Sequence, residues 1–204
     1  MKINLMLGGE FPKSVNSEHK WVGVDSGVNY LLKNGIEPNY IIGDLDSIDP
    51  KFLKLYPGKI IKKLNQDMTD AEYALNVVDS LYKNVEEIDV YGATGGRLDH
   101  FFANILLLNN SKFENKQLKI IDDNNIIFIS GVGKIYFNKV EEFKYISFVP
   151  LQKDTVISIL GSKYEVIDYE LSIDRANATS NEFIDEKIEF ITNKKCLIIY
   201  SKDK

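Results

Sequence analysis

Closely spaced carboxylates mark the first half of the sequence. Asp44 and Asp46 are separated by one residue and directly follow an apolar run, while Asp67 and Asp70 flank the start of a helical pattern. Carboxylates at such spacing can reach one small cation together, and Mg²⁺ prefers oxygen ligands. A surface turn also uses Asp and Ser, but it less naturally combines them with glycine after a buried strand. The pattern favours a divalent-metal site.

A glycine-rich segment, 92–100, follows another apolar run. Its glycines leave backbone N–H groups free at a helix N-terminus, where phosphate oxygens bind well. Arg97 adds a planar donor and is one of two arginines among 25 lysines and arginines. The spacing is not that of a Walker A loop. His100 either orients Asp99, contacts a substrate or is a structural residue, and the sequence leaves these readings open.

A third polar segment is formed by Asp25, Ser26 and Gly27. Asp25 could accept a hydrogen bond from a ribose hydroxyl, and Gly27 lets a ligand approach the backbone. The alternative is an ordinary Asp/Ser helix cap. Carboxylates for a metal, an anion-binding loop and an arginine together suit phosphoryl-type transfer from a nucleotide. Two histidines and one cysteine make a zinc site or a Cys-His nucleophile a poor match.

The elements that must position these residues alternate between strand and helix. Short apolar runs predict strands at 3–7, 21–24, 40–42, 59–61, 88–91 and 118–121. Helical patterns lie at 27–34, after Pro50, at 69–82 and at 97–108. This alternation predicts a doubly wound, mainly parallel α/β sheet with flanking helices. Ligands of such sheets bind at the carboxyl ends of the strands, which is where the three polar segments lie.

The pattern changes after residue 123. Strand-like stretches then follow one another across short turns, at 126–130, 134–137, 145–149, 155–160, 163–169, 187–192 and 195–200. We therefore expect an α/β domain over 1–123 and an antiparallel β-sandwich domain over 124–204.

Composition limits the partners of this 204-residue chain. Its formal net charge of −5 argues against nucleic acid and against anionic membranes. The single cysteine, Cys196, excludes an internal disulfide and lies in an apolar run typical of a core strand. Without a signal-peptide pattern or a membrane-spanning run, the expectation is a cytoplasmic protein.

The motifs, taken in order, resemble the thiamine pyrophosphokinase (thiamine diphosphokinase) family. The matching segments are 25–27, 43–47, 67–70, 92–100, 161–164 and 179–183. The resemblance implies transfer of a pyrophosphoryl group from ATP to the hydroxyl of thiamine, giving AMP and thiamine diphosphate. It also implies a homodimer whose active site lies at the subunit interface. Residues 1–123 would bind ATP and Mg²⁺, and 124–204 would bind thiamine and dimerise.

The resemblance also implies roles for individual residues. Asp44, Asp46, Asp70 and Asp99 would be catalytic, and Asp44, Asp46, Asp67 and Asp70 would hold Mg²⁺. The ATP site would comprise Gly9, Asp25, Ser26, Gly27, Thr94, Gly95, Gly96, Arg97 and His100. Gln66, Ser180 and Asn181 would face thiamine. Some relatives stack a tryptophan on thiamine; here the only Trp is Trp21, in a predicted core strand, which leaves Tyr164 or Phe183 as candidates.

The expected mechanism is in-line attack of the thiamine hydroxyl on the β-phosphorus, with Asp70 or Asp99 accepting the proton. The sequence leaves two alternative functions open. One is a haloacid-dehalogenase-like, Mg²⁺-dependent phosphatase in which Asp44 is the nucleophile, although the segment 92–100 has no role in that scheme. The other is a non-catalytic nucleotide-binding module.

Overall fold

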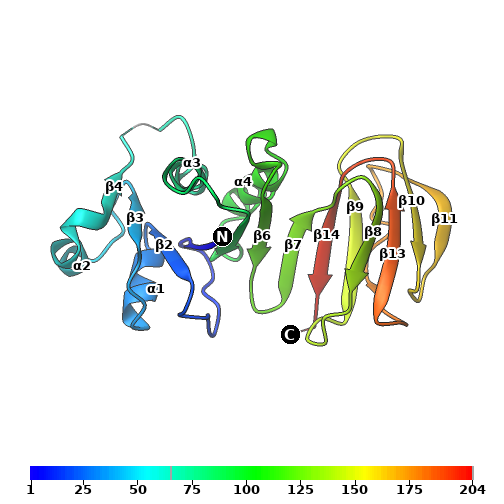
Figure 1. Ribbon diagram of the computed structural model, residues 1–204, viewed down its shortest axis with the longest axis horizontal. Helices are drawn as coiled ribbons and strands as arrows, with labels where there is room; N and C mark the ends of the chain where they lie inside the picture. The colour runs from blue at the N-terminus through cyan, green and yellow to red at the C-terminus, as the bar shows by residue number, and fades with distance from the viewer. Residues whose placement is uncertain (65, 204) are drawn as a thin grey trace. The chain divides into compact units, whose positions relative to one another are not determined.

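The computed structural model describes residues 1–64 and 66–203, and the chain divides into two compact units, Met1–Asp123 and Asn124–Lys204 (Figure 1). The strands of the first unit are β1 Lys2–Met6, β2 Lys20–Val24, β3 Tyr40–Gly43, β4 Ile60–Lys62, β5 Glu87–Tyr91 and β6 Gln117–Ile121. Its helices are α1 Gly27–Lys33, α2 Pro50–Leu55, α3 Asp70–Leu81 and α4 Leu98–Leu108, with short 3-10 helices at Pro57–Lys59 and Ser111–Phe113.

The six strands of the first unit pair in the order β6-β5-β1-β2-β3-β4, and each of these neighbouring pairs is parallel. The chain builds outward from β1 to β4 and then returns to the other side of β1 with β5. The strand order therefore reverses between β1 and β5, and the crevice at their carboxyl ends is the place where open α/β sheets bind ligands. The predicted doubly wound sheet is confirmed.

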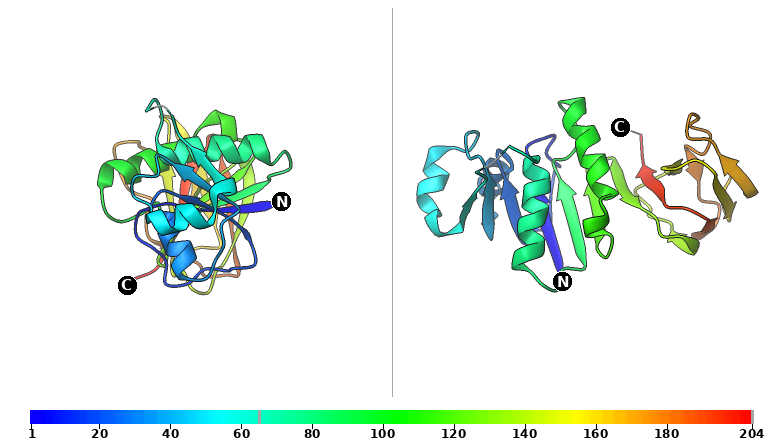
Figure 2. Two further views of the ribbon diagram at one scale, coloured as in Figure 1. Left: turned by 90° about the vertical axis from the view of Figure 1, so that its left-hand side faces the viewer. Right: turned by 90° about the horizontal axis from the view of Figure 1, so that it is seen from above.

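Helices cover both faces of this sheet. Leu31 of α1 packs with Met6 and Trp21 on one face. On the other face, Leu75 of α3 and Leu108 of α4 enclose a small apolar space with strand residues of β1, β5 and β6. Figure 2 shows α3 and α4 side by side over the strands. The near-continuous apolar runs of the sequence follow from this burial on two sides.

Local sequence explains where α3 begins. The Thr69 side chain accepts a hydrogen bond from the backbone N–H of Glu72 at 3.2 Å, which is the Thr-to-N3 hydrogen bond of a capping box. Asp70 and Glu72 place negative charge in the first turn, where the helix dipole favours it. The start of α3 is thereby fixed next to the loop that carries Asp67.

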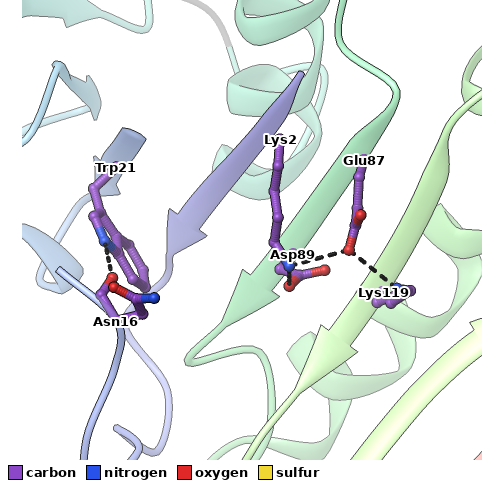
Figure 3. Close-up of polar contacts among 6 residues, drawn as sticks. All are labelled: Lys2, Asn16, Trp21, Glu87, Asp89 and Lys119. Atoms are coloured by element: carbon purple, nitrogen blue, oxygen red, sulfur yellow. Dashed lines mark hydrogen bonds and ion pairs between the residues drawn. The ribbon is translucent and has the colours of Figure 1, made fainter. Parts of the chain in front are cut away.

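Charged side chains form a balanced network at the amino ends of β1, β5 and β6 (Figure 3). Lys2 lies 2.5 Å from Asp89 and 3.0 Å from Glu87, and Lys119 lies 3.1 Å from Glu87. Asp89 is fully buried, and burial raises the pKa of its carboxyl, while Lys2 partly opposes this change. Two cations thus face two carboxylates. The same figure shows Trp21 donating its indole N–H to the carbonyl of Asn16.

The second unit consists of antiparallel strands. They are β7 Asn125–Ile129, β8 Gly133–Asn138, β9 Tyr145–Pro150, β10 Thr155–Leu160, β11 Val166–Leu171, β12 Asn181–Glu182, β13 Lys187–Thr192 and β14 Cys196–Ser201. One layer has the order β12-β9-β14-β7 and the other β11-β10-β13-β8. Phe148 of β9 stacks on Phe190 of β13 with ring centroids 4.6 Å apart, so the two layers share one core. The predicted sandwich is confirmed; the sequence reading missed the two-residue strand β12.

Helix α4 departs from the usual pattern of a surface helix. Leu98, Phe102 and Leu106 follow one another at four-residue spacing and are 71%, 63% and 73% exposed. Leu108 is its only buried residue. Large apolar side chains aligned on one exposed face usually mark an interaction surface. Among the described residues, no helix is long and apolar enough to cross a membrane.

Candidate active site

A pocket of about 730 Å³ opens in the first unit, lined by the loops that follow β1, β2, β4 and β5. Eleven predicted site residues line it: Gly9, Asp25, Ser26, Gln66, Asp67, Asp70, Thr94, Gly95, Gly96, Arg97 and His100. Gly27, Asp44, Asp46 and Asp99 belong to the same unit but are not among the lining residues. The pocket lies at the reversal point of the sheet, as expected for a ligand site of an open α/β fold.

Close backbone approach builds the floor of the pocket. The N–H of Gly9 donates to the carbonyl of Gly92 at 2.8 Å. A Cβ on Gly92, whose φ is +65°, would lie 2.4 Å from the Leu7 carbonyl oxygen. Side chains are therefore excluded where the loops after β1 and β5 meet. Gly95 and Gly96 also have positive φ, which turns this loop into the N-terminus of α4.

Asp25 is held in a strained position at the centre of the site. Its φ is +47°, and its Oδ1 packs so closely on Gly43 that a Cβ there would lie 1.8 Å away. That oxygen is buried and has no hydrogen-bond partner. Burial, followed by the nearby Asp70 and Asp44, raises the pKa of Asp25 to about 7, and Lys63 partly opposes this change. Ser26 makes no side-chain capping bond to α1, so the Ser cap considered from the sequence is absent.

Asp44 and Asp46 share a hydrogen-bonded turn after β3. The N–H of Asp46 donates to Asp44 Oδ1 at 3.2 Å. The hydrogen bond that the Asp46 carboxyl shares with Asp44, together with repulsion between the two charges, raises the pKa of Asp46. The spacing read from the sequence thus brings two mutually repelling carboxylates together.

Lys63 is a site residue that the sequence reading missed. Its side chain is 2% exposed, and its ammonium lies 2.8 Å from Asp70 Oδ1. No aligned hydrogen bond satisfies that oxygen, so the contact is an ion pair only. The available signal was position, because Lys63 lies two residues after the predicted strand at 59–61, as Asp44 lies two residues after the one at 40–42.

Arg97 and Asp99 form a forked ion pair on the surface. Arg97 Nη2 lies 2.5 Å from Asp99 Oδ2, and Nε lies 3.1 Å from Oδ1. The guanidinium lowers the pKa of Asp99, and the carboxylate raises that of Arg97. The backbone N–H of His100 also donates to Asp99. Asp99 therefore accepts a hydrogen bond at the start of α4, and His100 contacts Asp99 through its backbone N–H.

Thr94 adds an unsatisfied hydroxyl to the pocket. Its Oγ1 is buried without a partner, and the residue is 8% exposed. The neighbouring carbonyl of Ala93 is occupied by the amide of Asn104 of α4. Buried polar atoms normally have partners, so the oxygens of Thr94 and Asp25 that lack a hydrogen bond indicate that a polar ligand completes the site.

The carboxylates that line the pocket are candidate ligands for a divalent cation. Within residues 1–64 and 66–203, no three His, Cys, Asp or Glu side chains converge closely enough to form a ready-made metal site. The chemistry nevertheless fits Mg²⁺, because the pocket offers hard carboxylate oxygens, and those of Asp25 and Asp70 include unpaired buried ones. Such ions usually retain waters and bind through few carboxylates together with substrate phosphates.

The predicted thiamine-side residues of the second unit have different surroundings. Asn181 is 4% exposed, and its amide donates to Ser162 Oγ and to the Tyr164 carbonyl, which fixes the turn before β11. Ser180 adopts φ +56° and donates its N–H to Ser147. Phe183 stacks on Tyr200 against the core, whereas Tyr164 is 59% exposed. Of the two aromatic candidates, Tyr164 is therefore the accessible one.

The fold and the pocket define a class: an α/β protein with an acidic and glycine-rich ligand site at the reversal point of its sheet, joined to an antiparallel β unit. Two family models match it, "Thiamin pyrophosphokinase, catalytic domain" over residues 11–121 and "Thiamin pyrophosphokinase, vitamin B1 binding domain" over 133–197. The chain belongs to the thiamin pyrophosphokinase family, an enzyme family of transferases.

Individual relatives agree over nearly the whole chain. Thiamine pyrophosphokinase of Bacillus subtilis is 33% identical, with 97% of this chain and 96% of the relative covered. The crystal structure of thiamine pyrophosphokinase from Bacillus subtilis covers both chains fully at 31% identity, with a TM-score of 0.90. The enzyme from Candida albicans, at 18% identity and a TM-score of 0.84 over 99% and 89% of the two chains, shows the shared fold. Neither the phosphatase nor the non-catalytic alternative is supported.

Proposed function

We propose that this chain transfers the pyrophosphoryl group of ATP to the hydroxyl of thiamine, giving thiamine diphosphate and AMP. The observation that carries the proposal is one pocket at the reversal point of the sheet, in a chain of the thiamin pyrophosphokinase family, where buried oxygens of Asp25 and Thr94 lack hydrogen-bond partners. A nucleotide with its cation offers the groups that these oxygens lack.

In this proposal the phosphates lie on the loop between β5 and α4. Gly95 and Gly96 leave N–H groups accessible there. Arg97 would release Asp99 and bind the phosphates in its place. Gly9, Ser26 and His100 line the same pocket and complete the ATP site. Gly27 acts indirectly, because a Cβ on it would lie 2.0 Å from the Met6 carbonyl oxygen.

Asp44, Asp46, Asp67 and Asp70 would hold Mg²⁺. When bound, the ion would neutralise phosphate charge and polarise the phosphoryl oxygens. The thiamine oxygen forms a bond to the β-phosphorus while the bond from that phosphorus to the α-bridging oxygen breaks, so AMP leaves with the bridging oxygen. We assign the proton of the hydroxyl to Asp70, because Asp70 lines the pocket and Asp99 does not.

Residues 124–204 would bind thiamine and dimerise, and residues 1–123 would bind ATP. Gln66, Ser180 and Asn181 would face thiamine, Asn181 by fixing the turn that carries the exposed Tyr164 ring. A homodimer is supported by the exposed apolar face of α4, which begins beside Arg97 and therefore joins the site. The cytoplasm is the compartment we propose, since ATP is the co-substrate and Cys196 is an unpaired, buried thiol.

The decisive experiment is incubation of the purified chain with ATP, Mg²⁺ and thiamine, followed by quantification of AMP and thiamine diphosphate. Equal amounts of the two products support the proposal. Release of inorganic phosphate with a phosphorylated Asp44 would indicate the phosphatase chemistry, and ATP binding without AMP formation would indicate a binding module.

A further inference from the structure

Lys63 places a buried cation among the carboxylates of the site. Lysine side chains are almost never fully buried unless they are paired. Here the side chain is 2% exposed, its ammonium lies 2.8 Å from Asp70 Oδ1, and it donates to the Met68 carbonyl at 3.0 Å. The neighbouring Lys62 has the usual exposed position. The burial of Lys63 is therefore specific to this position, directly after β4.

Lys63 also connects the three acidic segments. Its backbone N–H donates to the carbonyl of Gly43 at 2.8 Å, at the turn that leads into Asp44. Asp25 Oδ1 packs against the same Gly43. Through its side chain Lys63 holds the loop before α3. Lys63 thus contacts the turn before Asp44 and the loop before α3, and Asp25 packs against that same turn.

We propose that Lys63 is the internal counter-cation of this acidic cluster and competes with a divalent ion for Asp70, so that the free protein binds divalent ions weakly until the nucleotide arrives. The inference rests on the proposed function for the identity of that ion. Without Lys63, neighbouring buried carboxylates would repel one another with no compensating charge. With Lys63 in place, an incoming divalent ion meets a like charge only a few ångströms away.

The role is one of positioning and charge balance. Lys63 touches Asp70, which would contact the ion, so Lys63 would act through another residue. ATP phosphates bring additional negative charge, which offsets the ammonium and favours entry of the ion together with the nucleotide. The expected order of binding is therefore the nucleotide–cation complex as a unit.

The test compares Mn²⁺ binding in the absence of nucleotide, measured by electron paramagnetic resonance, for the wild-type chain, Lys63→Met and the exposed control Lys62→Met. We expect Lys63→Met to bind Mn²⁺ more tightly, on the order of tenfold, and the control to stay within about twofold. In buffer with a chelator, Lys63→Met should unfold at a lower temperature than wild type. Added Mn²⁺ should raise its unfolding temperature more than that of wild type.

A purely structural role predicts the opposite sign, because a disordered site would bind Mn²⁺ less well. Equal or weaker binding by a folded Lys63→Met protein would overturn the inference. If that variant does not fold, Lys63→Gln is compared instead, since its amide can still donate to the Met68 carbonyl, and the same tightening is required.

The outcomes separate this inference from the proposed function. If the wild-type chain forms AMP and thiamine diphosphate but Lys63→Met leaves Mn²⁺ affinity unchanged, only the inference fails. If no AMP forms, the proposed function fails. The Mn²⁺ affinities of wild type and Lys63→Met still test the role of Lys63. A wild-type chain that binds no Mn²⁺ even with ATP present overturns the inference as well, because competition requires a site.

Discussion

Asp25→Asn should stabilise the metal-free protein at neutral pH while it removes activity. The pocket forces the Asp25 carboxyl into a buried position beside Asp70 and Asp44, and this raises its pKa from the ordinary 3.8 to about 7. A folded-state pKa above the unfolded one means that the folded chain binds more protons between about pH 4 and pH 7. Stability therefore falls as the pH rises through that range.

The size of this effect follows from the same numbers. A rise from 3.8 to about 7 corresponds to about 4 kcal/mol for a fully buried group. Because Asp25 is partly exposed and shares its repulsion with ionised neighbours, we expect about half of this, or about 2 kcal/mol above pH 7. Asparagine has nearly the same shape and no charge, so the gain should vanish near pH 4, where Asp25 is neutral.

The assay is urea unfolding of both proteins from pH 4 to pH 8 with a chelator present. Asp154→Asn is the control, since that side chain is 86% exposed and its φ of +56° suits asparagine. We expect this control to differ from wild type by less than about 0.5 kcal/mol at every pH. An Asp25→Asn protein that is no more stable at pH 8, or equally stabilised at pH 4 and pH 8, would refute the reasoning.

Three further perturbations test other parts of the molecule. Asp44→Asn should lower kcat on the order of 100-fold in the AMP assay, whereas Asp49→Asn, at the exposed cap of α2, should leave it nearly unchanged; comparable rates would contradict the assignment. Phe102→Glu should convert a two-chain particle into a single chain in light scattering, and an unchanged mass would exclude this face as the dimer contact. Lys2→Met should lower the free energy of unfolding by about 2 kcal/mol, since it leaves the buried Asp89 without its nearest cation, and a loss under about 0.5 kcal/mol in urea unfolding would argue against the pairing.

The sequence predicts the fold well because two strong local signals coincide. Runs such as that of β3 are apolar at nearly every position since helices cover both faces of the sheet, and a capping residue marks the start of α3. Most boundaries shift by one or two residues, and β11 begins at Val166, three residues after its predicted start at 163. Strand β4 begins at Ile60 rather than Lys59, because Pro57–Lys59 form a 3-10 turn.

The candidate site is predicted in outline because its polar segments follow strands, and parallel strands end at one edge. The spacing of residues in the sequence does not reveal which partner each polar side chain contacts. Lys63 is indistinguishable by type from the other lysines until the structure buries it. Asn181 reads as a free ligand group until its amide is found bonded to Ser162 and Tyr164. Periodicity likewise gives α4 an apolar face without saying what covers it.

Both ends of the same sheet bury charge, and they do so differently. At the amino ends two cations, Lys2 and Lys119, face the two carboxylates of Glu87 and Asp89. At the carboxyl ends Asp25 and Asp70 lie near the buried ammonium of Lys63, and Asp44 and Asp46 add further negative charge. An unbalanced cluster persists only when the rest of the fold holds it in place and a cation compensates for its repulsion during function. The excess of negative charge at this end is therefore the physical reason to expect a cation to bind there with the nucleotide, and it is also why removing one of these charges should make the empty protein more stable.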